Sequence, residues 1–191
     1  MKLKSVKKIR DEWCDSEDGK LSKESLNELK KHLESNNTDN LCEAMSLVTD
    51  ARIMEYVPLI EKLLTNEWSI VREFAIGKLL GLLKIPAYAE IGLKMAQEDE
   101  DSGVRCLAAT NLGHILDLAD SKLKKKIASY MYNVMIQNNY DERTKQNIYQ
   151  SVMIAVDVPW KERPSIVLGK PDLQKMVNPT IVQKFKEKYG L

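Results

Sequence analysis

The sequence predicts an all-α fold built from stacked helical hairpins, and three observations predict it. Apolar residues recur at three-and-four spacing almost everywhere up to about residue 156, which is the periodicity of amphipathic helices. Glycine and proline are scarce, with 8 and 6 residues in a chain of 191. A sequence pattern also repeats within the chain, at a period typical of two-helix units that bury their faces against their neighbours.

The first three helices are expected within the first 50 residues. Residues 3–13 carry apolar side chains on one face and predict a short opening helix. A polar turn follows at residues 15–20. The second helix is expected to begin near Ser22 and to end at the asparagine pair 36–37, and the third to cover about residues 39–49.

The next two helices contain the most apolar part of the sequence. The fourth is expected over about residues 51–64, where Pro58 would remove one backbone hydrogen bond and kink the helix mid-way. After a short break at residues 65–68, an apolar helix is expected over residues 69–83. The segment 84–86 ends it and starts the next one, because proline is favoured in the first turn of a helix.

An internal repeat is the strongest organisational signal. Residues 71–83 match residues 104–116 at a constant offset of 33. A third, degraded copy lies at residues 145–152, at an offset of 40 from the second. The matched positions of the first two copies are Val71, Arg72 and Ala75 in one and Val104, Arg105 and Ala108 in the other.

These segments resemble HEAT repeats. The first copy has a proline, Pro58, in its first helix and the sequence Val-Arg-x-x-Ala at the start of its second helix. The second copy, residues 86–117, keeps the turn and the Val-Arg pair but lacks the proline. The resemblance is clearest over residues 52–117 and weaker over residues 118–157. It is weakest over residues 22–50, where Asp39-Asn40-Leu41 replaces the Val-Arg pair.

The resemblance implies a single domain over residues 1–191. Its fold would be a right-handed α-solenoid of about four HEAT-like hairpins over residues 22–157. An irregular C-terminal tail, residues 158–191, would cap it. Two prolines five residues apart exclude a regular helix over residues 158–164. We expect an extended piece at 165–168, a turn at 169–172, and a final helix opened by Pro179 that packs on the last hairpin.

Charge and composition limit the possible partners and the compartment. The 29 Lys and Arg residues balance 28 Asp and Glu residues, so the formal net charge is +1. Such a balance argues against a nucleic-acid partner, and we expect the basic run Lys122–Lys126 to be a solvated face. Three widely spaced cysteines, no apolar run of membrane-spanning length and no signal peptide predict a cytoplasmic protein without a membrane partner.

Acidic residues gather at the predicted turns between paired helices. Residues 85–120 contain seven acidic against two basic residues, a local balance of −5. Stacking of the hairpins would align these turns into an acidic ridge that attracts a partner protein with a basic surface. The alternative is that these acids only complement helix dipoles. The residues concerned are Glu67, Glu98, Asp99, Glu100, Asp101, Asp141 and Glu142.

Four large side chains allow both a structural and a binding role. Trp68 and Trp160 are candidate interface anchors, because exposed tryptophan is typical of interface hot spots. Tryptophan also fills the grooves between hairpins. Arg72 and Arg105 could contact a partner, although the equivalent arginine of HEAT-like stacks usually pairs with a loop carbonyl or acid.

No motif points to catalysis, a metal or a cofactor. The two histidines, His32 and His114, are far apart and lack the neighbours of a zinc site. A glycine-rich phosphate loop, a His-Glu-x-x-His motif and a Gly-x-Ser-x-Gly motif are all absent from the sequence. We therefore expect no catalytic residues, no metal site and no cofactor.

The leading hypothesis is a non-enzymatic protein-interaction module. Small bacterial proteins that resemble this chain are often immunity proteins that bind and neutralise a toxin, so the resemblance implies that role. One alternative is a HEAT-like DNA glycosylase or DNA-binding protein, which needs a basic face lined with aromatic residues. Another is a lyase or a maturation scaffold with the same fold. The partner's identity and the oligomeric state stay open.

Overall fold

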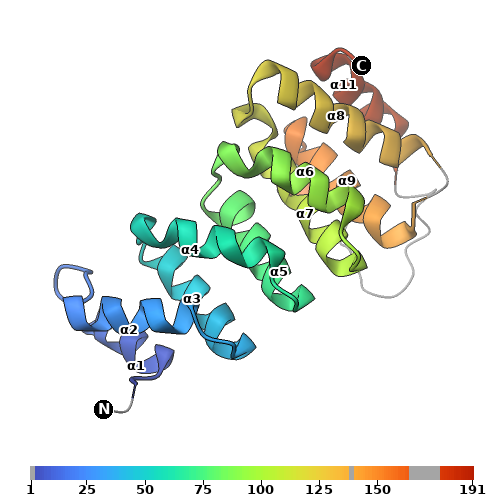
Figure 1. The fold of residues 1–191 in the computed structure, drawn as a ribbon. Coiled ribbons are helices and arrows are strands. Elements are labelled where there is room, and N and C mark those ends of the chain that lie inside the picture. The colour runs from blue at the N-terminus through green and yellow to red at the C-terminus, as the bar shows by residue number, and fades with distance from the viewer. Residues whose placement is uncertain (1–2, 138–139, 164–176) are drawn as a thin grey trace. The chain divides into compact units, whose positions relative to one another are not determined.

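The computed structural model describes residues 3–137, 140–163 and 177–191. Every regular element in these ranges is helical (Figure 1), so the predicted all-α class is confirmed. The chain divides into two compact units, Met1–Leu83 and Lys84–Leu191. The single domain expected from the sequence stays a prediction. Each unit has its own buried apolar residues and is described by itself.

The N-terminal unit begins with three regular helices. Each starts at a side chain that accepts a hydrogen bond from a backbone N–H of the first turn, which satisfies one of the otherwise unpaired donors there. These capping residues are Ser5, Ser22 and Asn37, which accept from the N–H groups of Lys8, Ser25 and Asn40. The helices are α1 (Val6–Asp15), α2 (Lys23–Leu33) and α3 (Thr38–Asp50).

The structure confirms the polar turn between the first two helices. Gly19 has a φ of +67°, a backbone conformation that glycine adopts at little cost. The indole Nε1 of Trp13 donates a hydrogen bond to the carbonyl oxygen of Gly19 at 2.9 Å. The side chain of α1 thereby closes the turn that leads to α2.

The fourth helix differs from its prediction. Instead of one kinked helix over residues 51–64, the structure has a 3₁₀ turn, Met54–Tyr56, then the short α4 (Val57–Lys62), then a second 3₁₀ turn, Leu63–Thr65. Pro58 lies in the first turn of α4, where its missing N–H needs no partner. It therefore starts a helix rather than kinking one.

The fifth helix has the predicted extent but not the predicted regularity. Helix α5 (Ser69–Ile76) continues into a π-helical segment, Gly77–Leu82, whose hydrogen bonds span one residue more than those of an α-helix. Lys84, with a φ of +52°, ends the helical path. The core of this unit contains fully buried side chains from α1, α2 and α3, from α4 and from the segment 69–82. They include Ile9, Leu29, Leu41, Met45, Ile60, Ile76 and Leu79.

The C-terminal unit consists of two helical hairpins and a terminal helix. Helices α6 (Ala89–Glu98) and α7 (Ser102–Ile115) form the first hairpin, and α8 (Ser121–Ile136) and α9 (Glu142–Ala155) form the second. Short 3₁₀ turns at Pro86–Tyr88 and Leu116–Leu118 precede α6 and follow α7.

The second helices of these hairpins pack against each other in parallel. The Nδ2 of Asn147 donates to Cys106 Sγ, and Ser151 Oγ donates to the carbonyl oxygen of Thr110, each across 41 residues. At Gly113 an added Cβ would lie only 2.4 Å from the Cβ of Ser151. Because contacts along α7 and α9 keep nearly the same offset, the two helices run side by side in one direction.

The terminal helix α11 (Pro179–Tyr189) packs on α8 and α9 (Figure 1), which confirms the predicted cap. Phe185 is fully buried. The N–H of Asn178 donates to Tyr149 Oη at 2.9 Å, and Tyr189 Oη donates to Asp117 Oδ1 at 3.0 Å. Residues 160–162 form only a 3₁₀ turn. The pieces expected at 165–168 and 169–172 lie outside the described residues.

Candidate protein interface

The acidic turn between α6 and α7 divides into two capping residues and two exposed residues. The Oδ1 of Asp101 accepts hydrogen bonds from the N–H groups of Gly103 and Val104, at 2.7 and 3.2 Å, and caps α7. Asp99 Oδ1 accepts from the N–H of Asp101 at 2.9 Å. The two aspartates therefore hold the turn, whereas Glu98 and Glu100 are exposed.

The turn before α9 has a similar construction. Asp141 accepts from the backbone N–H of Thr144 at 2.9 Å and from its hydroxyl at 2.7 Å. Burial alone would raise the pKa of Asp141, but the hydrogen bonds from Thr144 and from the backbone outweigh burial and lower the pKa. Asp141 thus stays ionised at neutral pH, and Glu142 is exposed in the first turn of α9.

These two turns lie at the same end of the C-terminal unit. Helices α7 and α9 pack in parallel with an offset of 41 residues, and their capping aspartates are 40 residues apart, so both helices begin at that end. We call residues 98–101 and 141–142 together the acidic turn surface. Glu67 lies in the N-terminal unit, and its place on the expected acidic ridge stays a prediction.

The two repeat arginines make the same contacts in their own units. Arg105 Nη1 donates to the carbonyl oxygens of Asp99 and Glu100, at 2.6 and 3.0 Å. Arg72 Nη1 donates to those of Asn66 and Glu67, at 2.8 and 3.2 Å. Each guanidinium thus satisfies the carbonyls six and five residues before it and stiffens the turn that precedes its helix. Val71, Ala75, Val104 and Ala108 are fully buried beside them.

Both candidate tryptophans are exposed, and Trp160 lies away from the acidic turn surface. Trp68 immediately precedes α5 in the N-terminal unit, with 52% of its surface exposed. Trp160 is 79% exposed and follows α9, with the guanidinium of Arg163 5.8 Å from its ring centre. The acidic turn surface lies at the opposite end of α9, about 20 Å away by helical rise.

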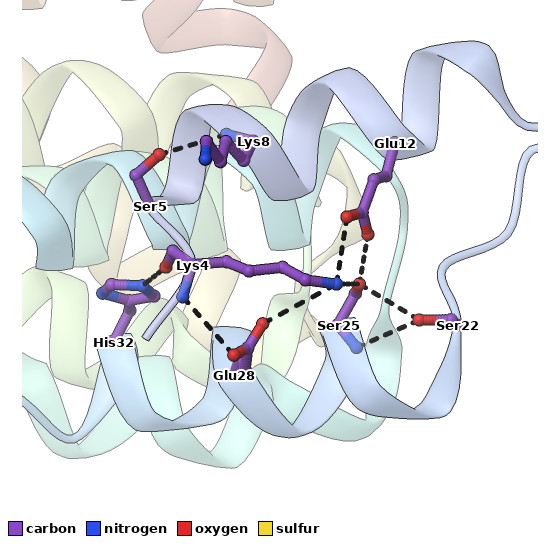
Figure 2. Close-up of polar contacts among 8 residues, drawn as sticks. All are labelled: Lys4, Ser5, Lys8, Glu12, Ser22, Ser25, Glu28 and His32. Carbon is purple, nitrogen blue, oxygen red and sulfur yellow. Dashed lines mark hydrogen bonds and ion pairs between the residues drawn. The ribbon is translucent and has the colours of Figure 1, made fainter. Parts of the chain in front are cut away.

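Sequence reasoning missed a polar cluster in the N-terminal unit (Figure 2). The ammonium of Lys4 pairs with Glu12 at 3.0 Å and lies 4.0 Å from the carboxylate of Glu28. The hydroxyl of Ser25 donates to Glu12, and His32 Nε2 donates to the carbonyl oxygen of Lys4 at 2.7 Å.

This cluster ties Lys4 and α1 to α2, and we call it the clamp. Ser25 is fully buried, and Glu28 and His32 are 5% and 4% exposed, whereas Lys4 and Glu12 are partly exposed. Glu28 Oε2 and His32 Nδ1 find no hydrogen-bond partner among the described residues. Glu28 and His32 are four residues apart on α2, and this i, i+4 spacing was the available signal for a shared helix face.

Sequence reasoning also missed a basic groove in the C-terminal unit. It is lined by one face of α6 and one face of α8, so lysines from two separate segments meet in it. The run Lys122–Lys126 was expected to be a solvated face. Three of its four lysines are exposed, as expected, and they line this groove together with Lys94 of α6. Helical spacing along each segment was visible in the sequence, whereas the pairing of α6 with α8 was not.

The chain matches no protein-family model, no curated protein and no solved structure. In the described part of the chain, no group of three or more His, Cys, Asp or Glu side chains is placed to hold a metal ion. No described helix combines the length and the apolar character needed to cross a bilayer.

Proposed function

We propose that this protein is a non-enzymatic interaction module that binds another protein through the acidic turn surface. The observation that carries the proposal is the parallel packing of α7 and α9, which puts two acidic turns at one end of the C-terminal unit. An acidic surface attracts a partner of opposite charge and speeds the encounter. The partner is therefore a protein with a basic surface.

The rigidity of the two turns supports this role. Asp99, Asp101 and Asp141 are fixed by backbone hydrogen bonds, and Arg105 holds the carbonyls of the first turn. A surface that is already ordered loses little conformational entropy when a partner binds. The exposed glutamates beside these residues therefore belong to turns that are ordered before a partner binds.

The finer proposal is a HEAT-like solenoid that acts as an immunity protein. The support is the 33-residue repeat, the equivalent contacts of Arg72 and Arg105, and the stacking of two hairpins beneath α11. In this proposal the partner is a toxic basic protein that the chain neutralises. Co-expression of this protein with the captured partner would then protect cells from it.

A charge-reversal experiment tests the proposal. Glu98→Lys with Glu142→Lys reverses two exposed acids and leaves the capping aspartates in place. Glu17→Lys with Glu24→Lys is the matched control, because Glu24 lies in the first turn of α2 and Glu17 in an exposed turn. Tagged proteins would be used for capture from the native host at moderate salt, followed by mass spectrometry and titration calorimetry of the captured protein.

We expect a basic protein to be retained by the parent and by the control. The Glu98/Glu142 variant should bind it about tenfold or more weakly, since each reversed charge turns an attraction into a repulsion. Equal binding by the variant and the control would remove the acidic turn surface from the proposal.

A further inference from the structure

We infer that the basic groove between α6 and α8 is a second binding site, which takes an extended acidic peptide segment of a partner protein. The groove has a volume of about 1010 Å³. It lies within the C-terminal unit and does not depend on the acidic turn surface.

The two walls of the groove run in the same direction. Lys126 of α8 pairs with Glu90 of α6 at 3.3 Å, and further along Tyr130 Oη donates to the carbonyl oxygen of Ala96 at 3.0 Å. The lining extends along α8 from Ser121 to its C-cap, Gln137, about 24 Å by helical rise. An extended peptide of about seven residues covers that length.

One end of the groove is basic. Lys94, Lys122, Lys125 and Lys126 line it, and Glu90 is the one acidic residue among the lining residues, so the net charge of the lining is +3. Among the residues that the structure describes, Lys94, Lys122 and Lys125 form no ion pair. Carboxylates of a bound segment would form ion pairs with these three lysines.

The other end presents amide groups. Gln97 of α6, Asn133 of α8 and Gln137, the C-cap of α8, line this end. None of these three side chains hydrogen-bonds to another described residue. A carboxamide both donates and accepts, which matches the N–H and C=O groups of an extended peptide backbone. This end adjoins the acidic turn surface, because Gln97 precedes Glu98 and Tyr140 precedes Asp141. The acidic residues of the segment therefore lie toward the lysine end.

The aromatic residues favour a peptide over a single nucleic-acid strand. Nucleic-acid strands need exposed ring faces on which bases stack. Tyr130 is 5% exposed and bonds to Ala96, and Tyr140 stands edge-on to it, with ring centres 6.5 Å apart. Burial also raises the pKa of Tyr130, so its hydroxyl remains a donor to the backbone of α6.

The test measures fluorescence anisotropy of labelled probes with the full chain at low salt. The probes are a peptide of about seven residues with Asp and Glu in one half and Ser and Gly in the other, the same peptide with Asn and Gln in place of the acids, and an oligothymidylate. The first variant is Lys94→Glu with Lys122→Glu and Lys125→Glu. Its matched control is Lys7→Glu with Lys8→Glu and Lys23→Glu, three exposed lysines of the N-terminal unit with the same change in net charge.

The parent and the control should bind the acidic peptide, more weakly as ionic strength rises, and the groove variant should bind it about tenfold or more weakly. Gln97→Ala with Asn133→Ala should weaken binding about threefold without a change in net charge, which charge attraction alone would not produce. Circular dichroism checks that each variant is folded.

Equal losses in the groove variant and its control would overturn the inference, because net charge would then explain both. So would tighter, lysine-dependent binding of the oligothymidylate than of the peptide. Absence of peptide binding by the parent would overturn it as well.

Discussion

The two units of this protein achieve stability by different means. The N-terminal unit combines an apolar core with a buried polar clamp, in which Lys4 and α1 are tied to α2 through Ser25, Glu28 and His32. Its later helical path is irregular, with two 3₁₀ turns and a π-helical segment. The C-terminal unit consists of longer, more regular helices, a close seam between α7 and α9, and a terminal helix held by one buried aromatic ring.

The difference concerns where charge is placed. In the N-terminal unit, the clamp pairs Lys4 with Glu12 and with the buried Glu28. In the C-terminal unit, helix caps and lysines form one acidic and one basic surface that face solvent. Charges that are paired with one another are not available to a partner, whereas ordered charges that are left exposed attract one. We therefore place binding in the C-terminal unit and expect the N-terminal clamp to act on stability alone.

The largest effect should come from the terminal helix. Phe185→Ala removes the fully buried ring of α11 and should cost about 3 to 5 kcal/mol, through lost apolar burial and the cavity that remains. Hydrogen exchange should show loss of protection over residues 179–189 and in α8 and α9, with the N-terminal unit unchanged.

Phe185→Leu is the control, since it keeps most of the apolar volume and should cost less than about 1.5 kcal/mol. Equal protection of residues 179–189 in Phe185→Ala and in the parent would show that α11 is held by its polar contacts instead.

The next effect concerns the seam between α7 and α9. Gly113→Ala places a Cβ 2.4 Å from the Cβ of Ser151 and 3.0 Å from its Cα, so the two helices must separate. The cost should be about 2 kcal/mol even though alanine favours helix, as measured by urea unfolding. In a Ser151→Gly background the same change should cost much less, because the contacting Cβ is gone. Equal costs in both backgrounds would mean that the seam adjusts without strain.

The smallest effect is the pH dependence of the N-terminal clamp. The hydrogen bond from Ser25, together with Lys4, lowers the pKa of Glu12 below its ordinary value of 4.5. Its contribution to stability is therefore complete above pH 4.5 and is lost as the pH falls through the lowered pKa. The hydrogen bond to Glu12 raises the pKa of Lys4 above 10.5, so that contribution is complete below pH 10.5 and is lost as the pH rises.

Urea unfolding of the parent and of Glu12→Gln at several pH values measures this effect. The parent should be the more stable protein at neutral pH, and the difference should shrink below pH 4.5. Glu17→Gln, at an exposed residue, is the control and should show no such trend. A difference between the parent and Glu12→Gln that is independent of pH would exclude the ionised pair as its source.

Local sequence patterns predicted the helical class and most helix starts. Apolar spacing is a local property, and so are the caps at Ser22 and the opening proline of α11, Pro179, because each acts on backbone groups a few residues away. The internal repeat also came within one residue of the register between α7 and α9. The second and third copies are 40 residues apart, and the contacts between the two helices are 41 residues apart.

Which charged residues lie together became clear only from the packing of the helices. The sequence grouped Asp99 and Asp101 with Glu98 and Glu100 as one acidic run, but hydrogen-bond geometry separates capping side chains from exposed ones. The sequence predicted the basic run to be a solvated face, and the structure adds Lys94 of α6 to the same groove. Pairings between residues far apart in sequence depend on how whole helices pack, and local spacing does not contain that information.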